Sequence, residues 1–250
     1  MANPNTVGSP ALARRADEVR NYRWIKKLTL TVMACIFILL TIIYVISVMY
    51  SRYGGFTVSV NKYQQIEYGL SLSETRDFLY PTSHLECRAS EDITNIDGSI
   101  LQKFDLGAID GEDSGQDYLC YTFYCKNVGQ KAMTYEYSID ISKMTLDIEK
   151  AVRVRLISNI NGGGASSVDY ARAAGVDENG NSVPEPDTVA FFNKNTVVRD
   201  QVGEFMPGDV TKYTVIIWLE GNDPDCVDAI LGGEFKVDMK ISVVSVTDTE

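Results

Sequence analysis

Histidine is almost missing from this 250-residue chain, and its scarcity leaves little room for catalysis that depends on a histidine. A Ser–His or Cys–His pair would have to use His84, whose surroundings, PTSHLEC, carry no nucleophile motif. The HExxH, GxSxG, Walker A and GxGxxG patterns are also absent, as are the two close CxxC pairs of a structural zinc site. We therefore expect a protein that is not an enzyme, with no catalytic residue and no cofactor.

Basic residues are scarce as well, and they are unevenly placed. The chain has 23 Lys and Arg against 34 Asp and Glu, a net charge of −11. Residues 1–27 hold six basic and two acidic residues, whereas the remainder holds 17 and 32. The acidic remainder argues against nucleic acid as a partner. The basic N-terminal segment suits the anionic cytoplasmic leaflet of a membrane.

One long apolar run stands out, Leu28–Tyr50, which contains no charged residue, Pro or Gly. Its 23 residues would span roughly 34 Å as a helix, enough to cross a bilayer core of about 30 Å. The excess of Lys and Arg before it, against Arg52 alone just after it, places residues 1–27 in the cytoplasm. The sequence therefore predicts a single-pass cell-membrane protein whose C-terminal part is extracellular.

A cleaved signal peptide is the alternative interpretation of this run. Its apolar region is usually about 7–15 residues and ends in a small-x-small cleavage site, and Ser47–Gly55 offers no such site. We expect the anchor at 28–50 to be retained, followed by a linker at 51–55 and one extracytoplasmic domain at 56–247.

Period-2 alternation dominates the part of the chain after the linker. In Met133–Ile141 and Phe235–Val243 every second residue is apolar, which is typical of half-buried antiparallel strands. Strand and helix patterns do not alternate, so the fold class we predict is all-β, an antiparallel β-sandwich or jelly roll with one short helix at Asp223–Gly233. Further strands are expected at Phe56–Asn61, Tyr118–Lys126, Val152–Ile157, Thr188–Phe192 and Tyr213–Leu219.

Two other stretches of this part of the chain are expected to be exposed. The Gly-rich stretch Asn159–Pro186 shows little apolar alternation and is predicted to be a long surface loop. Arg153 and Arg155 alternate with apolar residues in a predicted strand, so we expect them on a solvated face.

Four cysteines follow the apolar run, and an even number in an oxidising compartment suggests two disulfides. Cys120 and Cys125 share one predicted strand, where they are roughly 16 Å apart on opposite faces and do not pair with each other. Cys87 would then bridge one of them and Cys226 the other.

Clusters of acidic residues in loops are the remaining candidate for an ion-binding site. Asp110, Asp113 and Asp117 form an oxygen-rich cluster, and Ca²⁺ prefers oxygen ligands on loops. They are weak candidates for structural calcium, the alternative being solvated acidic turns. No other metal ligands are assigned.

Two segments resemble a known family: YLCYTFYCKNVGQKAMTYEYSIDI at Tyr118–Ile141 and FMPGDVTKYTVIIWLEGNDPDCVDAILGGEFKVDM at Phe205–Met239. The first resembles the aromatic hairpin of Gram-positive surface proteins related to the TasA/camelysin matrix-fibre group, and the second resembles the ending of Firmicutes ectodomains of similar layout. The resemblance implies a jelly-roll-like fold and, in some members, assembly into extracellular matrix filaments by donation of an N-terminal strand. Those members are cleaved after the membrane segment, and this chain departs from them in lacking a good cleavage site.

These observations lead to a functional prediction. We expect a membrane-anchored extracellular structural or adhesion module that contacts other surface proteins or itself, including as a fibre or matrix subunit assembling by strand addition. Phe56, Val58 and Val60 follow the possible hinge Gly54-Gly55 and are the strand-swap candidates. The alternative function is a carbohydrate- or peptide-binding surface module that uses the 159–186 loop and exposed tyrosines.

Overall fold

The computed structural model describes residues 10–52, 55–88 and 93–247, which divide into two compact units, one up to Tyr53 and one from Gly54 onward. Residues 1–9 of the predicted tail and residues 53–54 of the predicted linker lie outside this description. We consider each unit by itself, and call the second the β domain.

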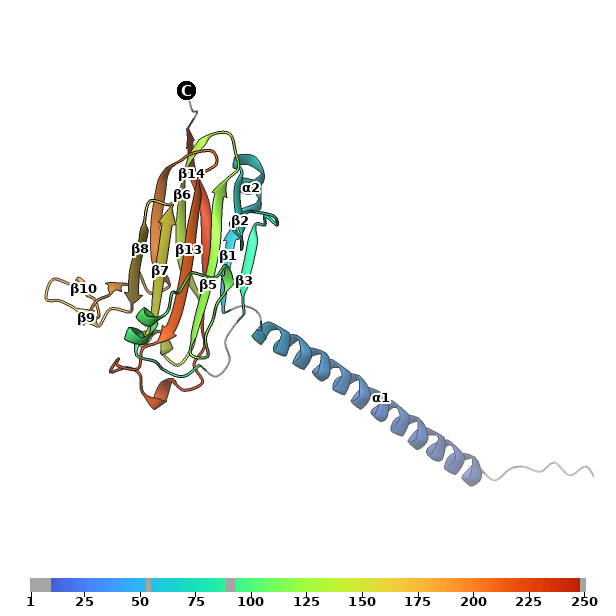
Figure 1. The fold of residues 1–250 in the computed structure, drawn as a ribbon. Helices are drawn as coiled ribbons and strands as arrows, with labels where there is room; N and C mark the ends of the chain where they lie inside the picture. Colours follow the sequence, from blue (N-terminus) through green and yellow to red (C-terminus); the bar gives the residue numbers. More distant parts are fainter. Residues whose placement is uncertain (1–9, 53–54, 89–92, 248–250) are drawn as a thin grey trace, which may run out of the picture. The chain divides into compact units, whose positions relative to one another are not determined.

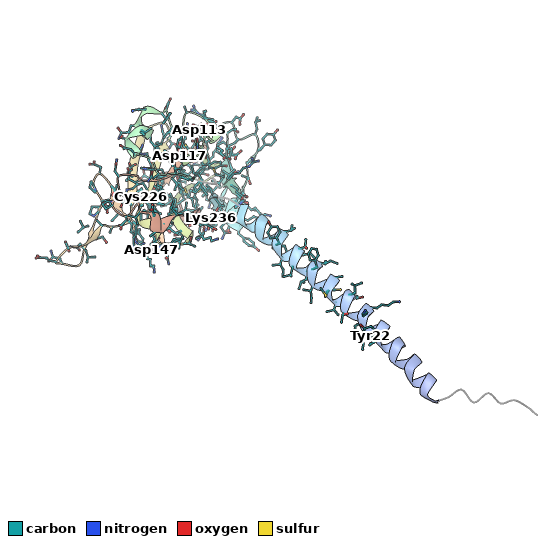
Figure 2. The ribbon with its side chains drawn as sticks, turned by 90° about the horizontal axis from the view of Figure 1, so that it is seen from below. Tyr22, Asp113, Asp117, Asp147, Cys226 and Lys236 are labelled. Atoms are coloured by element: carbon teal, nitrogen blue, oxygen red, sulfur yellow. The ribbon has the colours of Figure 1, made fainter. Side chains whose placement is uncertain are left out.

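The first unit is the helix α1, Pro10–Arg52, on which Tyr22 lies (Figure 2). Its segment Trp24–Ile46 is long and apolar enough to cross a membrane, a test that an N-terminal signal sequence also passes. The hydroxyls of Thr29, Thr31 and Thr41 donate to backbone carbonyls three or four residues earlier. The helix therefore satisfies these polar groups internally, as a span in lipid requires.

The β domain is built from two sheets and a small hairpin (Figure 1). The five-stranded sheet has the order β12 (Thr196–Phe205), β6 (Ala132–Met144), β14 (Phe235–Thr247), β1 (Phe56–Val60) and β3 (His84–Cys87). The seven-stranded sheet has the order β11 (Val189–Ala190), β8 (Ala165–Ala171), β7 (Val152–Ile160), β13 (Val210–Leu219), β5 (Tyr118–Asn127) and β2 (Leu70–Ser73), with β4 (Gly111–Glu112) also paired to β5. The hairpin β9 (Gly175–Val176) and β10 (Ser182–Val183) projects from the sheets.

The two sheets pack face to face over one main hydrophobic core. Phe56 of the five-stranded sheet contacts Tyr121 of the other, with ring centroids 6.0 Å apart. Deep in this core the hydroxyl of Tyr135 lies 2.9 Å from both Tyr213 Oη and Thr211 Oγ1. The buried polar groups are thus paired with one another, which avoids the cost of an unsatisfied hydroxyl. The predicted all-β class is confirmed, and both of the clearest alternating segments are long central strands, β6 and β14.

A second, smaller cluster lies on the outer face of the seven-stranded sheet. Leu101, from the 3₁₀ helix η1 (Gly98–Lys103), covers Cys120, Ile216 and Trp218. The loop that carries η1 therefore shields the middle of this face from solvent.

Three local predictions need correction. The segment 159–186 is not one long loop, because β8 and the β9–β10 hairpin lie within it. Thr188–Phe192 contains only the two-residue strand β11. The predicted helix Asp223–Gly233 is a series of turns with one 3₁₀ turn, η3 (Asp228–Ile230), although the Asp223 carboxylate accepts from the Asp225 N–H at 2.8 Å as an N-cap would.

The sequence patterns also missed the short helix α2, Lys62–Tyr68. Asn61 caps its start by accepting from the Tyr63 N–H, and Gly69 ends it in the left-handed conformation at φ +79°. Both signals are ordinary helix boundaries, but seven residues without a buried side chain give no apolar periodicity.

Candidate functional sites

The strand-swap candidates lie in β1, in the interior of the five-stranded sheet. Strand β1 pairs in parallel with β14, Val58 opposite Met239, and antiparallel with β3, Val58 opposite Leu85. Phe56, Val58 and Val60 point into the core and are fully or almost fully buried. The first strand after the helix unit therefore fills a slot between β14 and β3 of its own chain (Figure 1).

The predicted disulfides are not supported, because all five cysteines are free thiols. Cys125 points into the main core and Cys120 into the outer cluster, so the two lie on opposite faces of β5, as their odd spacing predicts. Cys226, labelled in Figure 2, instead accepts a hydrogen bond from Asn95 Nδ2 at 3.2 Å. The spacing of the cysteines along the chain does not show how the strands pack, and this packing separates Cys87 and Cys226 from their predicted partners, Cys120 and Cys125.

Burial keeps two of these thiols protonated. The pKa of Cys87 is raised to about 12, first by desolvation and then by the nearby Glu112 carboxylate. The pKa of Cys120 is also raised to about 12, by desolvation and then by Asp113. Because the thiolate is the reactive form, both side chains behave as small apolar groups.

The predicted calcium candidates have different partners. Asp110 accepts from the Tyr124 hydroxyl at 2.6 Å, and Asp117 accepts from the backbone N–H and the hydroxyl of Thr94. Asp113 and Asp117 are labelled in Figure 2. Within the described residues no group of three or more His, Cys, Asp or Glu side chains could hold a metal ion. The three carboxylates are therefore not brought together as one ligand set.

A charged cluster at one end of the outer face corrects the interpretation of Arg153 and Arg155 as solvated. Arg153 is only 5% exposed and pairs with the buried Asp223 carboxylate at 2.5 Å. Arg155 binds Asp169 through two hydrogen bonds of 2.6 and 2.8 Å and lies over the Trp218 ring, 5.3 Å from its centroid. These ion pairs line a cavity of about 550 Å³. Because each guanidinium already has a carboxylate partner, the cluster holds the 220–233 segment and β8 in place.

A polar groove lies at the other end of the same face. Tyr124, Lys212 and Asn159 occupy paired positions on β5, β13 and β7, so their side chains form a row across three strands. With the turns at Asn161-Gly162 and Gly208-Asp209 they line a cavity of about 620 Å³. We call this the polar groove; its other lining residues are Val210 and the exposed Arg76.

The Tyr124–Lys212–Asn159 row was missed by sequence reasoning for a specific reason. Tyr124 lies within the predicted strand Tyr118–Lys126, but its neighbours Lys212 and Asn159 are 88 and 35 positions away along the chain. Pairing of β5 with β13 and of β13 with β7 is what brings them together. No sequence motif marks these three residues; only the register in which the strands pair would have identified the row.

Comparison with known proteins adds little. No known protein family matches the chain, and no curated protein matches it. Among solved structures, a β-glucosidase from Kluyveromyces marxianus in complex with glucose is similar over 68% of this chain, with 10% identity and a TM-score of 0.22. The match spans 15% of the length of that enzyme. A similarity this weak carries no argument about fold or function.

Proposed function

We propose that this protein is a membrane-anchored extracellular structural or adhesion module that contacts neighbouring proteins by strand addition. In this proposal α1 holds the chain in the membrane, residues 1–27 are cytoplasmic and the β domain faces outward. The apolar segment of α1 and the basic excess before it support this topology. The finer jelly-roll assignment and the relation to the TasA/camelysin group belong to the same proposal.

The observation that carries the proposal is the placement of β1. Its five residues are paired on both sides, in parallel with β14 and antiparallel with β3. The strand also supplies Phe56, Val58 and Val60 to the core. It stands at the start of the β domain, so an equivalent strand from a neighbouring chain can fill the same slot with the same hydrogen bonds and the same buried side chains.

Deletion of β1 would not test this proposal, because it would remove three core side chains and unfold the domain. A cysteine pair across the slot is a better probe. Ser59 of β1 lies opposite Lys240 of β14, and neighbouring strands about 4.7–4.9 Å apart are within reach of a disulfide. Ser59→Cys/Lys240→Cys should form intermolecular disulfides in native membranes if neighbouring chains exchange β1.

The control keeps Lys240→Cys and changes only its partner. Ser138 of β6 lies opposite Lys240 on the other side of β14, and β6 and β14 both stay with the body of the domain when β1 is exchanged. Ser138→Cys/Lys240→Cys should therefore give only monomers on a non-reducing gel, whereas the β1 pair gives dimers and higher species. Monomers alone from both pairs would contradict strand addition.

A further inference from the structure

We propose that the polar groove is a binding site for a small anionic polyol, a ligand that carries several hydroxyls and one acid group. The site is separate from the β1 slot, so it goes beyond strand addition and either proposal can fail without the other. The groove's volume of about 620 Å³ falls in the usual range of small-molecule sites, about 300–1,000 Å³.

The requirement for a ligand hydroxyl comes from Asn159. Its Oδ1 atom is buried and, alone among the buried side-chain nitrogens and oxygens that the structure describes, has no hydrogen-bond partner. A buried acceptor without a donor costs free energy, about 1–3 kcal/mol. Because this oxygen is closed to solvent, the Asn159 side chain must turn toward the groove, and a hydroxyl of a bound polyol would then donate to it and remove the penalty.

The requirement for an acid group comes from Lys212. Its ammonium donates to the Gly107 carbonyl at 2.6 Å and lies 5.7 Å from the centroid of the Tyr124 ring. No carboxylate in the described part of the chain forms an ion pair with Lys212 or with Arg76 at the rim. An ammonium has three donors and only one is used here, so two remain for an anionic ligand.

The acidic groups near the groove are already engaged with the protein. Asp110 accepts from the Tyr124 hydroxyl, and Asp209 accepts from the Met206 N–H at 2.8 Å. Asn161, through its Oδ1, accepts from the Val210 N–H at 2.9 Å and fixes the neighbouring turn. The groove therefore offers the Lys212 ammonium and the Arg76 guanidinium to a ligand, and each neighbouring carboxylate accepts at least one hydrogen bond from the protein itself.

Two glycines line the groove. Gly162 and Gly208 have positive φ angles of +72° and +90°, and a Cβ at either position would meet no atom within 4 Å. Neither glycine therefore adds a side chain to the groove, whereas Asn161 and Asp209 of the same turns line it. Two kinds of ligand share the required chemistry, a sugar acid with a carboxylate and a polyol phosphate.

Calorimetry on the full-length protein in neutral-lipid nanodiscs tests the proposal, with D-glucuronate and glycerol 3-phosphate as probes and glucose and glycerol as neutral analogues. We expect one or both anions to bind and the neutral analogues to bind far more weakly. The anion that binds shows whether the acid group of the ligand is a carboxylate or a phosphate. Lys212→Met should weaken binding by about ten- to a hundredfold, the range for losing a hydrogen bond to a charged group.

Two further variants make the test specific. Asn159→Asp should also abolish binding, because the new carboxylate would repel the ligand and pair with Lys212. Lys240→Met removes a cation from the other sheet and should leave binding unchanged, and all three variants should keep the wild-type melting temperature within a few degrees. Absence of binding by both anions, equal binding of glucose and glucuronate, or unchanged binding in Lys212→Met would overturn the proposal.

Discussion

The buried ion pair between Arg153 and Asp223 shows how strongly a single residue can affect the stability of this protein. The Asp223 side chain is fully buried and that of Arg153 nearly so, and their atoms are 2.5 Å apart. Removing one partner leaves an uncompensated buried charge, so Arg153→Met should lower the free energy of unfolding by about 3–5 kcal/mol in chemical denaturation.

The matched control for this variant is a more exposed arginine. Arg199 lies 3.8 Å from Glu136 and its side chain is 46% exposed, so Arg199→Met should cost less than about 1 kcal/mol. The double variant Arg153→Met/Asp223→Leu should recover part of the loss, since it removes both charges. Equal effects of the two arginine variants would show that the buried pair does not stabilise the 220–233 segment.

The buried thiols predict a pH dependence. Cys87 and Cys120 have folded pKa values of about 12, against an ordinary value of 9.0. The unfolded chain therefore loses these protons at lower pH than the folded protein does. The stabilisation is fully present below pH 9 and is lost as pH rises toward 12.

Urea unfolding across this alkaline range should show the decline in stability directly. In the variant Cys87→Ala/Cys120→Ala the decline should be smaller but not absent, because burial also raises the pKa of Cys125 and of several tyrosines, and the variant will be less stable throughout. A wild-type slope identical to that of the double variant would contradict thiol burial as its cause.

At the scale of elements, β1 is the most consequential segment. Phe56 is fully buried and contacts the rings of Tyr121 and Phe123. Phe56→Ala should therefore lower the free energy of unfolding by about 3–5 kcal/mol. Tyr63→Ala, in the exposed helix α2, is the control and should stay within about 0.5 kcal/mol of wild type. A small effect of Phe56→Ala would mean that β1 does not hold the sheets together.

A glycine contact holds the end of α2 against the β5–β6 turn. A Cβ on Gly69 would lie 2.3 Å from the backbone nitrogen of Gly129, whereas one on Gly180 would meet nothing within 4 Å. Both glycines have positive φ, +79° and +82°, so alanine at either should cost about 1–2 kcal/mol. Gly69→Ala should cost about 1–3 kcal/mol more, because the backbone must move; equal melting temperatures for the two variants would show that this contact is not tight.

The elements that could be predicted from the sequence are those whose own residues carry a clear apolar pattern. The alternating runs Met133–Ile141 and Phe235–Val243 were found because one face is apolar, and the apolar run of α1 because it lacks charge. Strand β8 was missed because it is short, polar and mostly exposed at its start, so its pattern resembles that of a loop.

The features that could not be predicted depend on pairing between distant strands. Arg153 was interpreted as solvated because its partner, Asp223, is 70 positions away. The disulfide prediction failed for the same reason, since cysteine count and spacing do not determine which strands lie side by side. The polar groove likewise exists only once β5, β13 and β7 are in register.

At the scale of the whole molecule, an apolar helix precedes a β domain whose first strand, β1, pairs within its own sheet. If β1 is exchanged as proposed, the anchor would determine how far the exchange can extend. With Leu28–Tyr50 retained, only neighbours in the same membrane can share β1. With it removed, chains would be free to assemble at a distance from the cell.

The central claim, that this is an anchored surface module, is tested most directly by intact-mass and N-terminal analysis of the protein taken from its native membrane. The account predicts a mature chain that still contains Leu28–Tyr50 and fractionates with the membrane. A mature chain that begins between residues 51 and 56 and is released from the membrane would contradict it.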